Sequence, residues 1–391
     1  MQISLLNHFS KQVPEHLQSL GYELLSEDKL QQANAIVLRS KSLHEHHAGK
    51  SLFAIARAGA GVNNIPIERF SEQGIAVFNA PGANANAVAE MVLTGILMQT
   101  RKVAAALNFS QQLFSDERED YATAMEKGKA QFQGRELLGL RLGIIGLGAI
   151  GVLLANKANA LGMQVLGFDP HISVENAWRL SAEVQQCESL SDLLANCDCV
   201  SVHVPYLPAT HHLLNFEQVA YLPKHAFVIN FSRAEVVDQE AITAAIESGN
   251  LDGYITDFPN PVLQSHPQVL CFPHLGASTV EAQENASMQV LTTLDNFLKR
   301  GEVKYSVNLP ALQPGPIPVG ASRLVIIHRN TVGMIAQITD CIEAAEKNIL
   351  EMNNRSRAEM ALTVIDLAAA ASASLLSTIQ AVPNVLSARY C

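Results

Sequence analysis

The residues best suited to chemistry follow two apolar runs in the second half of the chain. Arg233 comes just after a run that ends at Phe231, and His274 comes just after a run that ends at Phe272. An arginine can bind a carboxylate and a developing oxyanion, and a histidine can exchange a proton near neutral pH. Either residue alone is equally typical of an ordinary loop. Together with a hydride carrier, the pair would suit the interconversion of a 2-hydroxy acid and a 2-oxo acid.

A glycine-rich turn predicts the site for such a carrier. Gly146, Gly148 and Gly151 have the G-x-G-x-x-G spacing between an apolar strand and a helix, and Asp169 ends the next apolar run. This layout places a dinucleotide pyrophosphate at a helix N-terminus and a carboxylate on a ribose. Because a carboxylate repels a 2′-phosphate, and no arginine directly follows Asp169, NAD is favoured over NADP.

The elements that must position these residues can be predicted from the apolar runs. Six runs indicate a parallel, doubly wound sheet, with strands over 142–145, 164–168, 198–204, 226–231, 252–257 and 268–272. Runs at 3–6, 35–38, 52–56 and 75–78 indicate a second α/β region ahead of it. Helices over 84–102 and 279–300 would connect the two regions, and we expect a ligand cleft between them.

A third region follows a proline-rich segment. The four prolines between residues 309 and 320 predict a stiff linker. Residues 322–391 alternate strand, helix, strand, strand, helix, strand, which predicts a small α+β domain. Removal of everything after about residue 308 is therefore expected to leave a folded, active protein. The charged segment 110–135 predicts a solvated helix or a dimerisation arm.

Composition excludes several classes of protein. The chain has 391 residues, 48% of them hydrophobic, which suits two or three domains with separate cores. Its formal charge of −10 argues against nucleic acid or an anionic membrane as partner. We find no leader pattern and no long apolar run, so we expect a cytoplasmic protein. The six cysteines lack Cys-x-x-Cys spacing and are expected to be reduced, and we expect no metal site.

Beyond these motifs, the chain resembles the D-2-hydroxyacid dehydrogenase family. The resemblance is carried by the glycine-rich turn, the segment around Arg233, and residues 57–65, 79–84, 88–90 and 273–279. It implies a doubly wound NAD-binding domain inserted in a flavodoxin-like substrate domain, followed by a domain that resembles the regulatory ACT module. The expected borders are 1–97 with 282–308 for the substrate domain, 98–281 for the NAD-binding domain, 309–320 for the linker and 321–391 for the ACT-like domain.

The resemblance also implies roles for particular residues. It makes His274 the acid and base and Arg233 the carboxylate-binding residue. Family members commonly carry a glutamate that orients the histidine, whereas this chain offers Asn260, which could hold the imidazole by a hydrogen bond. Ala234 stands where glycine is usual. The contacts with NAD implied by the motif or the family are Gly146, Gly148, Ala149, Ile150, Gly151, Asp169, Phe231, Ser232, Arg233, Asp257 and Gly276.

Substrate and effector residues complete the expectation. The acidic chain must supply positive charge locally for an anionic substrate, and Arg39, Ser40, Lys41 and Arg57 are the candidates for a phosphate. The resemblance adds Gly59, Ala60 and Asn84 on the substrate side, and His328, Asn330 and Asn354 as ligands for serine in the C-terminal domain. That domain could instead serve dimerisation without a ligand.

The expected activity is NAD-dependent oxidation of D-3-phosphoglycerate to 3-phosphohydroxypyruvate, which opens serine biosynthesis, in a homo-oligomer, either a dimer or a tetramer. Two alternatives stay open. One is a dehydrogenase acting on another D-2-hydroxy acid, such as a substrate of the glyoxylate or lactate type. The other is an NAD-sensing protein without turnover. The presence of both Arg233 and His274 argues for turnover.

Overall fold

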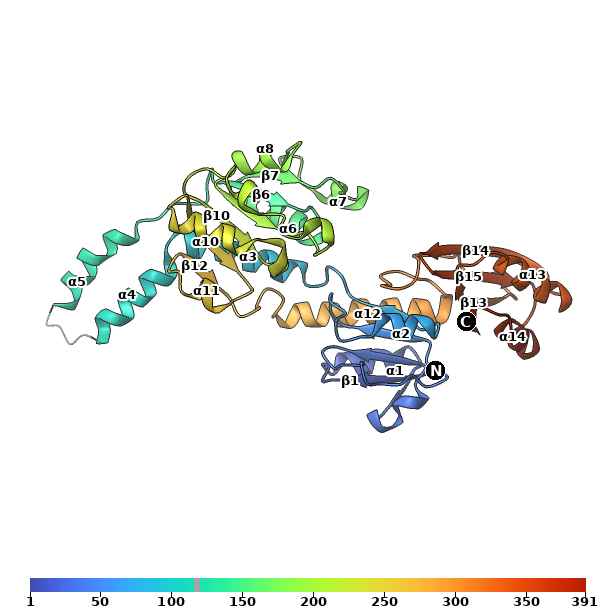
Figure 1. The fold of residues 1–391 in the computed structure, drawn as a ribbon. Coiled ribbons are helices and arrows are strands. Elements are labelled where there is room, and N and C mark those ends of the chain that lie inside the picture. The colour runs from blue at the N-terminus through green and yellow to red at the C-terminus, as the bar shows by residue number, and fades with distance from the viewer. Residues whose placement is uncertain (116–119) are drawn as a thin grey trace. The chain divides into compact units, whose positions relative to one another are not determined.

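The computed structural model describes residues 1–115 and 120–391, which form two compact units (Figure 1). The first unit contains residues 1–84 and 283–391, and the second contains residues 85–282. The border predicted at residue 97 falls inside helix α3 (Ala85–Thr100), which belongs as a whole to the second unit. The chain returns to the first unit inside α12 (Val280–Arg300). Each unit is described by itself below.

The second unit is built on a parallel sheet of seven strands, in the order β12-β11-β10-β9-β6-β7-β8. The six predicted strands are all present, and β8 is a short polar edge strand that hydrophobicity could not indicate. The strands are β6 (Arg141–Ile145), β7 (Gln164–Phe168), β8 (Gln185–Gln186), β9 (Cys199–Val202), β10 (Ala226–Asn230), β11 (Leu251–Thr256) and β12 (Val269–Cys271).

Helices cover both faces of this sheet, which confirms the doubly wound prediction. Because successive strand residues point to opposite faces, Ile144 joins the core under α3 and α6 (Ala149–Ala160), while Ile145 joins the core on the other side. The helices of that other side are α8 (Leu190–Ala195), α9 (Phe216–Val219), α10 (Gln239–Glu247) and α11 (Pro261–Gln264). The carboxyl ends of all these strands share one edge, where Arg233 and His274 were expected.

The charged segment 110–135 falls in the second unit. Helices α4 (Val103–Ser115) and α5 (Tyr121–Gly128) project from the sheet in Figure 1. Residues 116–119 of the predicted arm lie outside the described residues. In the part of the chain that is described, no helix combines the length and hydrophobicity needed to cross a membrane.

The first unit contains a five-stranded parallel sheet in the flavodoxin-like order β2-β1-β3-β4-β5. Helices α1 (Gln12–Ser19) and α12 pack on one face, and α2 (Ile67–Glu72) packs on the other. The four predicted strands are present, and the short edge strand β2 adds a fifth. The strands are β1 (Gln2–Leu6), β2 (Glu23–Leu25), β3 (Ala35–Leu38), β4 (Ala54–Arg57) and β5 (Ala76–Phe78).

The C-terminal part of the first unit is an antiparallel sheet of four strands in the order β14-β15-β13-β16. The alternation predicted for residues 322–391 is confirmed by β13 (Ser322–Arg329), α13 (Met334–Ala344), β14 (Ile349–Arg357), β15 (Met360–Leu367), α14 (Ala373–Gln380) and β16 (Val385–Tyr390). Both helices pack on one face through a core of their own. The arrangement matches the expected α+β domain.

The opposite face of this C-terminal sheet is also buried. Val325, Ile327 and Leu362 on that face belong to the same core as Phe297 of α12 and Phe78 of β5. The first residues of the predicted linker contribute as well, because Leu309 and Leu312 are buried in this core. Within the first unit, the C-terminal sheet is therefore packed against the flavodoxin-like part and is more than a tethered module.

Candidate active site

The glycine-rich turn has the geometry that dinucleotide binding requires. Gly146 has a φ of 92°, and a side chain there would meet the backbone of His203 at 2.9 Å. A Cβ on Gly151 would lie 2.1 Å from the Gly146 carbonyl oxygen, so glycine lets α6 approach the turn. A Cβ on Gly148, directly before α6, would meet no atom within 4 Å. The space in front of Gly148 is thus open for a ligand at the helix N-terminus.

Asp169 stands at the end of β7 beside this turn. One carboxylate oxygen accepts the backbone N–H of Leu147 at 2.8 Å, and the other accepts that of His171 at 2.8 Å. The carboxylate is therefore fixed to the turn and keeps lone pairs for ribose hydroxyls. Burial lowers the pKa of the nearby His203 to about 4, so that imidazole is neutral at physiological pH.

The loop after β10 presents Arg233. The amide of Asn230, the last strand residue, organises this loop: its oxygen accepts the N–H and hydroxyl of Ser232, and its nitrogen donates to the Arg233 carbonyl at 2.9 Å. The Arg233 side chain is exposed and donates to the Ser232 carbonyl oxygen. Ala234 begins a short 3-10 helix and is not among the residues with positive φ, so alanine fits where the family usually has glycine. Asn230 is a positioning residue that motif reasoning missed.

The loop after β12 presents His274 and is fixed by Asp257. The Asp257 carboxylate is buried at the end of β11 and accepts the N–H of Leu275 at 2.6 Å and that of Gly276 at 2.8 Å. A Cβ on Gly276 would lie 3.0 Å from this carboxylate. His274 itself is exposed, with a φ of 57°, and its ring lies edge-on to Phe258 at 5.4 Å. Asp257, predicted as a cofactor contact, thus anchors the histidine loop in this structure.

Asn260 does not have the predicted contact with His274. Its side-chain oxygen caps α11 by accepting the N–H of Leu263 at 3.0 Å, and its nitrogen donates to Gln239 at 2.8 Å. Asn260, three residues after Asp257, serves as a helix cap because α11 begins directly after it, at Pro261. Among the described residues, no carboxylate forms an ion pair with His274. The histidine is oriented by its loop and by Phe258.

The predicted phosphate residues meet in the first unit. Arg39, Ser40 and Arg57 line a pocket of about 400 Å³ at the carboxyl ends of β1, β3 and β4, together with Asn7, His8 and Ala58. Arg57 is half-buried, and burial lowers the pKa of its guanidinium. Its Nε donates to the Arg39 carbonyl oxygen at 2.9 Å, and it also donates to the Gly61 carbonyl oxygen. Two arginines therefore line one pocket of an acidic chain, an arrangement that suits an anion.

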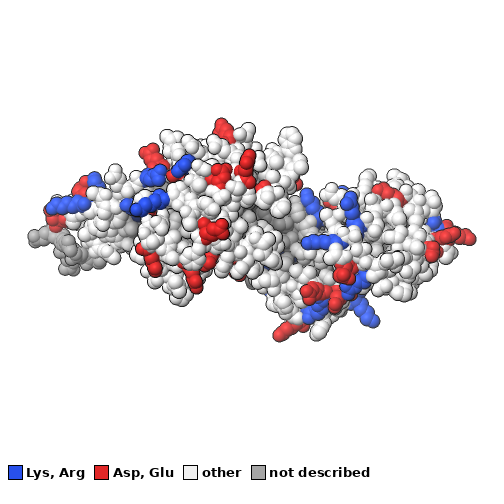
Figure 2. All heavy atoms as spheres, turned by 45° about the horizontal axis from the view of Figure 1, so that its top comes forward, with Lys and Arg blue, Asp and Glu red and all other residues white. Residues whose placement is uncertain are grey.

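The other predicted substrate residues have different surroundings. The Lys41 ammonium forms an ion pair with Glu27 and does not line the pocket. A Cβ on Gly59 would lie 3.5 Å from the Arg57 guanidinium, and the Ala60 carbonyl oxygen accepts a hydrogen bond from Asn79. Asn84 lies directly before α3. On the face seen in Figure 2, Lys and Arg side chains are interspersed with Asp and Glu.

The three predicted effector residues form two groups. His328 is buried, and its ring nitrogens contact the Thr363 hydroxyl and the Arg329 carbonyl oxygen, both at 2.8 Å. Thr363 in turn contacts the Asn354 side chain at 2.9 Å. Asn330 is exposed and donates to the Ala358 carbonyl oxygen instead. Burial lowers the pKa of His328, which is therefore a neutral link inside the sheet and is not exposed to a ligand.

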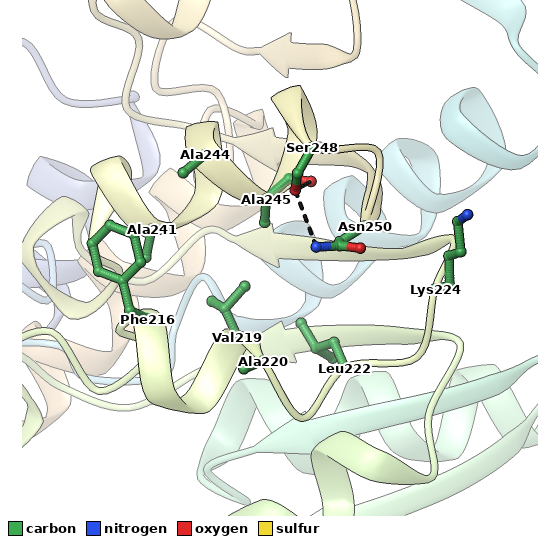
Figure 3. A pocket seen from close by; sticks show the side chains of 10 residues that line it. All are labelled: Phe216, Val219, Ala220, Leu222, Lys224, Ala241, Ala244, Ala245, Ser248 and Asn250. Carbon is green, nitrogen blue, oxygen red and sulfur yellow. Dashed lines mark hydrogen bonds between the residues drawn. The ribbon is translucent and has the colours of Figure 1, made fainter.

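Two further features carry none of the predicted site residues. A pocket of about 340 Å³ lies between α9 and α10, with an apolar floor and Lys224, Ser248 and Asn250 at one end (Figure 3). The six cysteines are free thiols. In the described ranges, no three His, Cys, Asp or Glu side chains are grouped as metal ligands.

Comparison with known proteins agrees with this geometry. Residues 103–276 match the family model described as D-isomer specific 2-hydroxyacid dehydrogenase, NAD binding domain. A D-3-phosphoglycerate dehydrogenase of Escherichia coli K12 is 32% identical over 391 residues, covering 96% of this chain and 90% of the relative. One from Haemophilus influenzae is also 32% identical, covering 88% and 82%.

Solved structures show the same fold. An NAD⁺-bound 3-phosphoglycerate dehydrogenase of Entamoeba histolytica has a TM-score of 0.60 and 27% identity, covering 79% of this chain and 98% of that one. The apo form of Rhodotorula graminis D-mandelate dehydrogenase has a TM-score of 0.65 and 24% identity, covering 80% and 99%. The chain belongs to the D-isomer specific 2-hydroxyacid dehydrogenase family.

Proposed function

We propose that this protein oxidises D-3-phosphoglycerate to 3-phosphohydroxypyruvate with NAD, the first step of L-serine biosynthesis. The observation that carries the choice of substrate is the pocket lined by Arg39 and Arg57, which provides two cations for a phosphate. Relatives named D-3-phosphoglycerate dehydrogenase, similar over most of the chain, support the same choice. A lactate or glyoxylate dehydrogenase has no need of such a pocket.

The residues of the second unit fit NAD. The open space before Gly148, the N-terminus of α6 and the fixed Asp169 carboxylate would hold the pyrophosphate and the ribose. We assign further contacts to Ala149, Ile150 and the loops at Phe231 and Gly276. When bound, NAD accepts the hydride that leaves the carbinol carbon.

The chain's own residues manage the proton and the charge. The imidazole of His274 accepts the hydroxyl proton as the carbonyl forms. The exposed Arg233 guanidinium binds the substrate carboxylate and stabilises negative charge that develops on the reacting oxygen. Asn230 and Asp257 hold the backbones of these two loops, so both groups are positioned before the substrate arrives.

A steady-state assay tests the proposal. The purified protein is given NAD with D-3-phosphoglycerate, D-glycerate or D-lactate at matched concentrations. We expect kcat/KM to be highest for D-3-phosphoglycerate, because only this substrate can use the pocket at Arg39 and Arg57. A preference for an unphosphorylated acid would assign the chain to another dehydrogenase. NAD binding without turnover of any of them would indicate a sensor.

Cofactor choice is expected to depend on the charge of Asp169. The wild-type protein should prefer NAD to NADP in kcat/KM, because the carboxylate repels a 2′-phosphate. Asp169→Asn keeps the size of the side chain and an oxygen for the turn while removing the charge. We expect this variant to narrow the preference by about tenfold or more, mainly through KM for NADP. A wild-type preference for NADP would contradict the assignment.

We propose further that L-serine binds the C-terminal domain and inhibits the enzyme. Asn330 and Asn354 offer amide groups, while the buried His328 supports Asn354 through Thr363. A ligand that binds the native state must stabilise it, so millimolar L-serine should raise the melting temperature and lower activity, with D-serine as control. Asn330→Ala should weaken both effects and leave kcat unchanged. No response to L-serine would favour a dimerisation role.

A homo-oligomer, either a dimer or a tetramer, is the final part of this proposal. Helices α4 and α5 project from the second unit and carry exposed apolar side chains, among them Leu107 at 57% and Tyr121 at 40% exposure. Exposed apolar side chains on a projecting element are typical of a surface covered by a second copy.

A further inference from the structure

Two asparagines, Asn7 and Asn64, hold the loop after β3 by hydrogen bonds to its backbone. The side-chain oxygen of Asn7 accepts the backbone N–H of Arg39 at 3.0 Å and that of Lys41 at 3.1 Å. The side-chain nitrogen of Asn64 donates to the carbonyl oxygen of Arg39 at 3.2 Å and to that of Lys41 at 2.7 Å. Four backbone groups of one short loop are thus bound by two side chains.

These hydrogen bonds replace those that a sheet would provide. Strand β3 ends at Leu38, so the backbone beyond it has no ladder partners. Asn64 is buried, and Asn7 directly follows β1 with a φ of 88°, a conformation that asparagine tolerates better than most side chains. Because β1 and β3 are neighbouring strands, Asn7 after β1 lies beside the loop after β3. The loop is therefore fixed by two side chains, Asn7 and Asn64, that are far apart in the sequence.

The fixed loop forms one wall of the anion pocket. Arg39 and Ser40 line the pocket, and so does Asn7 itself. The Asn7 amide nitrogen also contacts the Ser40 hydroxyl at 3.4 Å, and Arg57 donates to the Arg39 carbonyl oxygen that Asn64 binds. Release of either asparagine would free the backbone that carries Arg39 and Ser40. Binding of an anionic group in this pocket would then be weakened, because Arg39 and Ser40 line it.

We propose that Asn7 and Asn64 are positioning residues that determine selectivity for a phosphorylated hydroxy acid over its unphosphorylated analogue. This inference rests on the proposed function, since it assigns the pocket to the substrate phosphate. Arg39 and Arg57 supply the charge, whereas the two asparagines supply a prearranged loop. Binding to a prearranged loop avoids the entropy cost of ordering it for each substrate molecule.

The experiment compares Asn7→Gly, Asn64→Ala and the double variant with Asn34→Ala as matched control. Glycine accepts the positive φ at residue 7, so that change removes the amide without straining the backbone. Asn34 accepts the N–H of Gln2 and donates to the Ser51 carbonyl oxygen, and it directly precedes β3, at the opposite end of the same strand. It is thus an asparagine with the same kind of contacts but away from the pocket.

Each pocket variant is expected to raise KM for D-3-phosphoglycerate about tenfold or more, with kcat changed by less than about threefold. The kinetic constants for D-glycerate and KM for NAD should stay within about threefold of wild type. Because both asparagines hold one loop, the double variant should lose less than the product of the single losses. Asn34→Ala should keep the wild-type selectivity, although it lowers the melting temperature similarly.

Equal losses for both substrates, or an unchanged KM for the phosphorylated one, would overturn the proposal. Hydrogen exchange at the amides of Arg39 and Lys41, together with calorimetric binding of inorganic phosphate, separates this inference from the proposed function. If wild type fails to oxidise D-3-phosphoglycerate, the proposed function fails. Faster exchange and weaker phosphate binding in Asn7→Gly would still support the positioning role, and unchanged exchange would refute it.

Discussion

Replacing His274 by alanine is expected to lower kcat about a hundredfold or more, because the variant loses the group that accepts the hydroxyl proton. The affinity for NAD should change little, since most of the assigned cofactor contacts lie at the glycine-rich turn, at Asp169 and on the loop after β10, and the His274 side chain is not among them. The measurement is steady-state turnover of D-3-phosphoglycerate, with NAD binding followed separately by calorimetry or fluorescence. Addition of imidazole to the alanine variant should restore part of the rate.

Backbone conformation must be controlled in this test, because His274 has a φ of 57° that alanine tolerates poorly. His274→Asn accepts this conformation more readily and still lacks an imidazole, so it should be as inactive as the alanine variant. His225 offers a matched control, with a φ of 71° and an exposed ring in the same unit. His225→Ala should keep wild-type kcat. Near-normal turnover in His274→Asn would remove His274 from the mechanism.

The helices and strands of both units could be largely predicted because their apolar runs have the periods of buried strands and amphipathic helices. The strands that were missed, β2 and β8, lie at sheet edges and carry exposed or half-buried side chains. At such positions, pairing with a neighbouring strand determines the conformation, and hydrophobicity does not reveal it. The predicted border at residue 97 lies inside α3, because hydrophobicity did not reveal that this helix packs against α6 and β11 of the second unit.

The exposed groups of the site could also be predicted, since Arg233 and His274 follow apolar strands. The residues that hold them are less visible, because their roles depend on hydrogen bonds across the tertiary structure. Asp257 was predicted as a cofactor contact, and in the structure its carboxylate accepts two backbone N–H groups of the loop that carries His274. Asn260 appeared as the partner of His274 and caps a helix instead. A polar residue that ends a buried strand is the signal that could have identified Asn230 and Asp257 earlier.

The proline-rich segment predicted an independent C-terminal domain, and the burial of one face of that domain's sheet changes the result that we expect from a truncation. Proline content indicates that the segment is stiff, but it does not indicate whether a face of the C-terminal sheet is buried against the rest of the first unit. Two arginines of that sheet donate hydrogen bonds to carbonyl oxygens at the C-terminus of α12. Arg389 donates to the carbonyl oxygens of Phe297 at 2.5 Å and Leu298 at 2.8 Å, and its guanidinium lies over the Phe297 ring. Arg323 donates to the Arg300 carbonyl oxygen and forms a buried ion pair with Asp366.

These contacts satisfy the carbonyl groups of Leu298 and Arg300, which the helix C-terminus leaves without partners, whereas the Phe297 carbonyl also accepts the N–H of Gly301 at 2.9 Å. Burial lowers the pKa of Arg389, which stays charged because an arginine pKa lies far above neutrality. Arg389→Ala should therefore destabilise the protein in two ways, by a cavity beside Phe297 and by an unpaired carbonyl at Leu298. We expect a melting temperature lower by about 5–10 °C, from a loss of about 3 kcal/mol. Arg355→Ala, an exposed residue on the same sheet, should change it by about 1 °C.

Truncation after residue 308 is expected to have a much larger effect, namely loss of a stably folded first unit. It removes the sheet side chains Val325, Ile327 and Leu362 from the core around α12, besides the caps provided by Arg323 and Arg389. A buried side chain of this size contributes about 1.5–3 kcal/mol, and whole proteins unfold at a cost of about 5–15 kcal/mol. The truncated chain should therefore melt far below wild type and aggregate in size-exclusion chromatography, with activity lost alongside. A monodisperse truncated protein with wild-type turnover would show that the C-terminal sheet is an independent module, as its linker first indicated.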